Sequence, residues 1–186
     1  MTESSYKIPD GWSIKKLGEI ADLYQPKTIS QSDLTEKGYP VYGANGFIGY
    51  YSECNHKNWQ ITITCRGSTC GTVNRTFGPA WITGNAMVVN VDKSDNVLKK
   101  FLFYYLLKED FKSIISGSGQ PQIVKAPLAN WKIALPPLSE QKAIADILSK
   151  ADEEIDLLTR KLDLLQSQKK GLMQQLLTGK IRIKVP

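Results

Sequence analysis

The sequence has few of the residues that build metal sites, disulfides and nucleophilic active sites. Its 186 residues include three cysteines and one histidine. Cys54, Cys65 and Cys70 form no CxxC pair, which argues against a disulfide framework or a standard zinc site. The neighbours of His56, in the segment CNHKN, supply no obvious base partner for a Ser-His or Cys-His nucleophile. We expect reduced thiols, a histidine in a surface loop, and no bound metal.

Long apolar runs and catalytic motifs are also missing. No apolar segment approaches the ~18 to 20 residues that a membrane span needs. The opening MTESSYKIPDGW has no cationic segment followed by an apolar core, so no secretory leader is expected. No paired-carboxylate motif or glycine-rich cofactor loop is visible. We therefore expect a cytoplasmic protein that binds no membrane and no cofactor and is not itself an enzyme.

Acidic residues are nearly absent from the middle of the chain. Between Lys37 and Val91 the one carboxylate is Glu53, although the whole chain carries a formal net charge of +6. Phosphates repel carboxylates and accept hydrogen bonds from hydroxyls, amides and backbone N–H groups. The composition therefore suits a polyanion partner, and it suits equally well a neutral β-rich region that lacks acids.

The first two thirds of the chain predict an irregular α+β domain rich in short strands. QITITC (60–65) alternates apolar and polar residues, AMVVNV (86–91) is β-branched, and glycines and prolines separate such segments. Residues 97–115 predict a helix that packs on the sheet. The segment SGSGQPQIVKAP (116–127) predicts a mobile glycine-rich loop, which suits either an ordinary surface or a close approach to a DNA backbone.

The last part of the chain predicts one long helix. After Pro136 and Pro137, Ser139 can cap a helix that runs to about Thr178, on the order of 60 Å at 1.5 Å per residue. Its apolar positions are spaced by four and three residues alternately, which predicts a coiled-coil seam for dimerisation. The seam residues are Ile144, Leu148, Ala151, Ile155, Leu158, Leu162, Leu165, Leu172 and Leu176.

Two features weaken this helix near its end. Lys169 interrupts the apolar seam, and Gly171 lowers the local helix propensity, so pairing should be weakest there. The basic tail TGKIRIKVP (178–186) suits a short closing strand and a phosphate contact equally well.

Three segments together resemble the specificity subunit of type I restriction-modification enzymes. They are the opening IPDGWSIKKLGEIA (8–21), the junction LPPLSEQKAIADIL (135–148) and the ending KKGLMQQLLTGKIRI (169–183). Their order and separation match one repeat of that family over nearly the whole chain. The resemblance implies a target recognition domain over residues 1–136 and a conserved spacer helix with a short tail over residues 137–186.

The resemblance also implies the partners. These are double-stranded DNA, methyltransferase (modification) subunits that supply cofactor binding and methyl transfer, and a restriction subunit as a further candidate. Typical members hold two recognition domains and two spacer helices, whereas these residues hold one of each. We therefore expect a homodimer, with antiparallel helices and a two-fold axis, that reads a bipartite palindrome with one half-site per recognition domain.

Candidate DNA contacts are the polar and basic residues of the recognition domain, with Arg66 and Arg75 first among them. The full set is Lys27, Tyr42, Asn45, Lys57, Arg66, Ser68, Thr69, Asn74, Arg75, Gln120, Gln122 and Lys125.

Two further groups each allow two interpretations. The aromatic residues Tyr42, Phe47, Tyr50 and Tyr51 are either core residues or a surface for DNA, and the lysines of the middle helix either face phosphates or are simply solvated. At the level of function, the competing hypothesis is a coiled-coil interaction protein that modulates specificity or methyltransferase subunits without choosing a DNA site.

Overall fold

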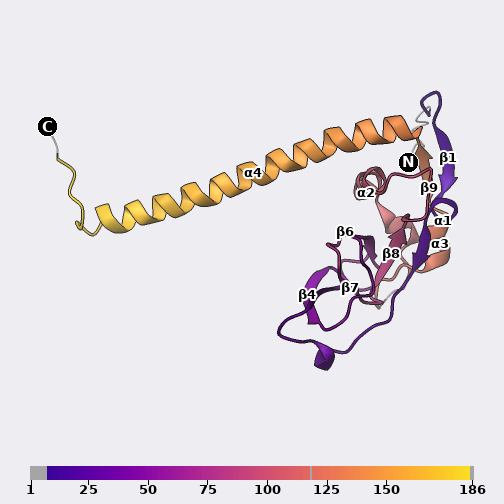
Figure 1. The fold of residues 1–186 in the computed structure, drawn as a ribbon, viewed down its shortest axis with the longest axis horizontal. Helices are drawn as coiled ribbons and strands as arrows, with labels where there is room; N and C mark the ends of the chain where they lie inside the picture. Colours follow the sequence, from indigo (N-terminus) through magenta and orange to yellow (C-terminus); the bar gives the residue numbers. More distant parts are fainter. Residues whose placement is uncertain (1–7, 118, 185–186) are drawn as a thin grey trace. The chain divides into compact units, whose positions relative to one another are not determined.

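The computed structural model describes residues 8–117 and 119–184 (Figure 1). The chain divides into two compact units, one ending at Ala145 and one beginning at Asp146. The first unit holds all the strands, and the second holds most of one long helix. This α+β organisation is the fold class that the sequence predicts.

A four-stranded antiparallel sheet forms the centre of the first unit. Its order is β2 (Asp22–Tyr24), β8 (Ala86–Asn90), β5 (Ile61–Thr64) and β6 (Val73–Arg75). The alternating segment 60–65 and the β-branched segment 86–91 therefore form strands, as predicted. Strands β5 and β8 pair antiparallel, with Ile61 opposite Val89.

The two faces of this sheet pack against different layers, because side chains alternate along each strand. Ile61 and Ile63 join the main core together with Leu102 and Leu106 of helix α2 (Lys99–Leu107). On the opposite face, residues of β8 pack with Ile82 in a second, smaller core. That residue belongs to a three-stranded sheet made of β3 (Tyr39–Gly43), β4 (Gly46–Tyr51) and β7 (Trp81–Ile82), in which β3 and β7 are parallel.

Helix α2 is shorter than the predicted helix over 97–115, and the prediction was wrong about its extent. The helix ends at Leu107, and a separate 3₁₀ turn, η2, covers Phe111–Ile114. The side chain of Asp110 accepts a hydrogen bond from the backbone N–H of Lys112 at 3.0 Å and so starts the new turn. Local capping therefore overrides the apolar periodicity at this point.

The predicted loop over 116–127 also proves more structured than expected. Ser116 and Gln122 exchange backbone hydrogen bonds at 2.9 and 2.8 Å, and Lys125 begins helix α3 (Lys125–Ala129). A further short turn, η1, covers Gln31–Asp33.

The opening and the junction segments of the sequence meet in the structure. Strand β1 (Ser13–Lys16) pairs antiparallel with β9 (Lys132–Leu135), and helix α1 (Leu17–Ile20) follows β1 directly. The indole N–H of Trp12 donates to Glu140 at 3.1 Å. Thus the tryptophan of IPDGW and the glutamate of LPPLSEQ contact each other although 128 positions separate them.

Helix α4 spans Leu138–Leu176. Ser139 lies inside the helix rather than before it, so its predicted capping role was wrong. The first turns belong to the first unit: Gln141 and Ala145 are fully buried, and Ile144 packs against the main core. No helix among residues 8–117 and 119–184 is long and apolar enough to cross a membrane. In the tail, the described residues up to Lys184 form no strand.

Candidate nucleic-acid interface

Arg75 lies at the end of β6, and its guanidinium is close to two aromatic rings. Its guanidinium carbon is 4.8 Å from the ring centroid of Trp59 and 5.6 Å from that of Phe77. Such contacts are attractive because the face of an aromatic ring is negative. Arg75 is exposed, and within residues 8–117 and 119–184 no carboxylate pairs with it.

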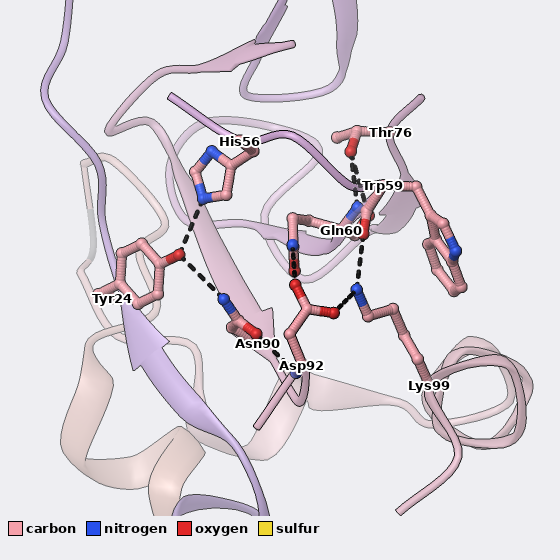
Figure 2. A network of polar contacts seen from close by, with 8 residues as sticks. All are labelled: Tyr24, His56, Trp59, Gln60, Thr76, Asn90, Asp92 and Lys99. Atoms are coloured by element: carbon pink, nitrogen blue, oxygen red, sulfur yellow. Dashed lines mark hydrogen bonds and ion pairs between the residues drawn. The ribbon is translucent and has the colours of Figure 1, made fainter. Parts of the chain in front are cut away.

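A polar network fixes the segment that carries Trp59. Figure 2 shows Lys99 of α2 reaching both the carboxylate of Asp92 and the backbone carbonyl of Trp59, the latter at 2.8 Å. The same carboxylate accepts a hydrogen bond from the side-chain amide of Gln60 at 2.8 Å. Burial acts to raise the pKa of Asp92, but hydrogen bonds from Lys99 and Gln60 outweigh it and leave this pKa below its ordinary value.

His56 is part of the same network, and the prediction of a surface residue was wrong. It is 8% exposed, its Nε2 lies 2.8 Å from the hydroxyl of Tyr24, and its Nδ1 lies 2.6 Å from the amide oxygen of Asn55. That oxygen can only accept, so Nδ1 carries the proton and Nε2 accepts from Tyr24. Burial lowers the pKa of His56, the charge of Lys99 lowers it further, and Asp92 opposes both.

A second group of predicted residues comes together at the β5–β6 turn. Arg66 and Gln122 form an antiparallel bridge, and the N–H of Gly67 donates to the carbonyl of Pro121 at 3.1 Å. Two tight turns follow in the same connection, with Gly67 at a φ of +88° that favours glycine. The structure therefore gathers Arg66, Ser68, Thr69, Gln120 and Gln122 from two separate loops.

A third group lies where the β3–β4 hairpin meets the four-stranded sheet. The side-chain amide of Asn74 donates to the oxygen of Asn45 at 3.1 Å, and the hydroxyl of Thr64 donates to the carbonyl of Ala44. Tyr42 is half-buried in the smaller core, and its hydroxyl accepts from the N–H of Phe77 at 3.2 Å.

The remaining candidates do not join these groups. Lys27, Lys57 and Lys125 are exposed and have no side-chain hydrogen bond or ion pair among the residues that the structure describes. In addition, the side chains of Asn74 and Arg75 lie on opposite faces of the sheet, because they are consecutive in β6. The twelve candidates thus form several groups rather than one cluster.

The aromatic and lysine groups also separate in the structure. Tyr51 packs edge-on against Trp81, while Phe47 and Tyr50 are exposed and contact each other. The four lysines of the predicted helix over 97–115 are Lys99, Lys100, Lys108 and Lys112, and three of them have carboxylate partners. Lys99 pairs with Asp92, Lys108 with Glu109 at 3.6 Å, and Lys112 with Asp110 at 3.1 Å. These ion pairs reduce the positive charge that a phosphate face would need.

Sequence reasoning missed Trp59 and Phe77. The signal that could have found them is the alternation Trp59-x-Ile61 on one strand and Arg75-x-Phe77 on its neighbour. The observed register Ile61↔Arg75 places Trp59 opposite Phe77 when it is extended by two residues.

The second unit carries the predicted seam on an exposed helix. From Leu148 onward the large apolar seam residues are between 37% exposed, for Leu176, and 59% exposed, for Ile155. Ala151 is exposed too. Ile144 differs from the rest because it is half-buried against the main core of the first unit.

Comparison with known proteins now decides the family. The model of the type I restriction modification DNA specificity domain matches residues 9–167. The chain belongs to this family. A type I restriction enzyme specificity subunit, MjaVIII, from Methanocaldococcus jannaschii is 28% identical over 96% of this chain and 48% of its own length. The EcoprrI specificity subunit of Escherichia coli is 32% identical over 74% of this chain and 35% of its own length.

A solved structure confirms the specificity-domain fold. The specificity subunit of a type I restriction-modification system from M. genitalium superposes with a TM-score of 0.74 at 20% identity. The match covers 94% of this chain and 47% of that subunit. The chain therefore spans about half the length of the relatives that it matches.

Proposed function

We propose that this chain is the specificity subunit of a type I restriction-modification enzyme and that its first unit reads one half-site in double-stranded DNA. The observation that carries the proposal is the pair of exposed arginines, Arg66 and Arg75. Both lie in the segment from Lys37 to Val91, which contains one carboxylate. Neither arginine has an acidic partner among the described residues. Arginines of this kind provide both base-edge and phosphate contacts.

Helix α4 pairs with a second copy of the chain. An apolar stripe of this length in water is costly. Full burial of an exposed leucine side chain is worth roughly 1.5 to 3 kcal/mol, and covering the exposed half of each seam leucine recovers a part of that. An antiparallel pair with a two-fold axis places two identical recognition domains at opposite ends, and it therefore reads a bipartite palindrome. In a dimer of this kind the helix length sets the spacing between the half-sites.

Methyltransferase subunits, and a restriction subunit with them, dock on the paired helices and supply all of the chemistry. Support comes from two leucines that lie outside the seam: Leu157 is 65% exposed and Leu164 is 71% exposed. They are seven positions apart, so they lie on one face of α4, turned away from the seam and therefore open to a further partner. The specificity subunit itself contributes no catalytic group and binds no cofactor.

Dimerisation is tested by substituting the seam. Leu158→Asp with Leu162→Asp introduces carboxylates into the interface, and the molar mass in solution should fall to that of one chain. The matched control, Arg160→Asp with Ser167→Asp, changes the opposite face of the same helix and should leave the mass at two chains. An unchanged mass in the seam variant contradicts the pairing.

DNA reading is tested by co-expressing the chain with a cognate methyltransferase subunit in a host that lacks DNA methylation and mapping modified adenines. The proposal predicts a bipartite palindromic motif. An assembled complex that leaves the genome unmethylated contradicts it and favours a protein that modulates its partners without choosing a site. The double variant Arg66→Ala, Arg75→Ala should still assemble but lose the motif.

A further inference from the structure

We propose that Arg75, whose guanidinium lies against the rings of Trp59 and Phe77, recognises a guanine in the half-site and that the two rings are positioning residues for it. This inference rests on the proposed function, and it adds the base that one residue reads.

The strand register places the three side chains together. β5 and β6 pair with Ile61 opposite Arg75. Beyond the strand ends the pairing continues, because the N–H of Thr76 donates to the carbonyl of Gln60 at 3.0 Å and the N–H of Gln60 donates to the hydroxyl of Thr76 at 2.8 Å. Trp59 and Phe77 are the next pair, so both lie on the face that carries Arg75.

Several contacts support the segment that carries Trp59. The carbonyl of Trp59 accepts from Lys99, and its ring packs edge-on against Phe103 of α2 with centroids 6.4 Å apart. Gln60 is 2% exposed and bonded to Asp92 (Figure 2). A side chain placed on such a scaffold loses little further conformational freedom when it binds.

Trp59, Arg75 and Phe77 form a group that we call the clamp, and among the described residues its cation has no acidic partner. Lys99 also lies near the indole, with its Nζ 5.0 Å from the ring centroid, but Asp92 neutralises it. Arg75 makes no ion pair and no side-chain hydrogen bond within the part of the chain that the structure describes. Its N–H edge is therefore available to an acceptor from outside the protein.

The contacts with two rings favour guanine over phosphate as that acceptor. A guanidinium has a planar fork of donors, and guanine presents O6 and N7 side by side in the major groove, where the fork matches both. Contacts with two rings restrict the orientations that this fork can adopt. A phosphate contact requires a positive charge but no fixed plane, and a lysine can supply it. Phe77 is 65% exposed, so the open side of the clamp lies at the surface.

The experiment maps methylation by the assembled complex for the wild-type chain and for four variants. Arg75→Ala should make one guanine position of each half-site degenerate and lower methylation of the original sites by roughly 5- to 150-fold, the range expected for one bidentate contact. Arg75→Lys should relax the same position, because lysine lacks the fork. Phe77→Leu should relax it less. Lys93→Ala, an exposed lysine outside the clamp, is the matched control and should retain the wild-type motif.

Three results would overturn the inference. These are a wild-type half-site without any G·C pair, an unchanged motif in Arg75→Ala, and full recovery of motif and rate in Arg75→Lys, which identifies a phosphate contact. A wild-type complex that yields no motif at all contradicts the proposed function itself, so the two failures are distinguishable.

Discussion

Replacing Gln141 with leucine is expected to destabilise the first unit by about 3 kcal/mol. Gln141 is fully buried at the start of α4 and makes three hydrogen bonds. It accepts from the N–H of Leu98 at 2.8 Å and donates to the carbonyls of Asn96 at 3.0 Å and Pro136 at 2.9 Å. One side chain thus ties the segment before α2 to the junction before α4.

The magnitude follows from the groups that lose their partners. A buried polar group without a hydrogen bond costs roughly 1 to 3 kcal/mol. Asn96 is exposed, so water can replace its lost bond, whereas Leu98 is half-buried and Pro136 is buried. Two unpaired groups at about 2 kcal/mol each, less about 1 kcal/mol for the greater apolarity of leucine, leave about 3 kcal/mol.

Urea unfolding followed by tryptophan fluorescence measures this loss. All four tryptophans, Trp12, Trp59, Trp81 and Trp131, precede Ala145, so the signal reports on the first unit. With a slope of about 2 kcal/mol per molar urea, the midpoint should fall by about 1.5 M. Gln174→Leu, on the exposed part of α4, is the matched control and should leave the midpoint in place. Equal midpoints for the two variants would refute the reasoning.

Three further predictions concern charge and helix propensity. Lys99 and Gln60 depress the pKa of Asp92 below 3.8, so the ionised carboxylate stabilises the folded state above about pH 4, and this contribution is lost as the pH falls through the lowered pKa. In urea titrations, the difference in unfolding free energy between wild type and Asp92→Asn should therefore shrink on acidification. Burial depresses the pKa of His56 below 6.5, so on acidification the unfolded state takes up the proton before the folded state does. The free energy of unfolding should therefore fall from pH 7 towards pH 5, and it should fall less steeply in His56→Gln. Gly171 has open space around its Cα, so Gly171→Ala should stabilise α4 by about 1 kcal/mol, measured by circular dichroism during thermal unfolding, and a lower melting temperature would contradict this.

Periodic patterns predicted the regular elements of this fold well. The alternation over 60–65 and the heptad spacing after Pro137 each produced the expected element, because a strand and a long exposed helix express their periods directly in the sequence. The end of α2 could not be predicted in the same way. It depends on one local cap at Asp110, which interrupts an otherwise continuous apolar pattern.

The composition of the sequence indicated which region holds the candidate site, but the positions of its residues could be predicted only in part. The scarcity of acids marked the region that holds Arg66 and Arg75, yet nothing local showed that two aromatic rings lie against Arg75. His56 was misplaced for a related reason. One of its partners is Tyr24, which lies 32 positions away on β2. Contacts of this range depend on sheet order, which the sequence pattern does not specify.

The central claim is that one recognition domain reads one half-site, and DNA binding by the assembled complex tests it most directly. Three duplexes carry the mapped motif with both half-sites intact, with one scrambled, and with both scrambled. We expect a large loss of affinity when either half-site is scrambled, equal for the two sides, and a further loss when both are. Equal affinity for all three duplexes would contradict the account, because the chain would then bind DNA without reading its sequence.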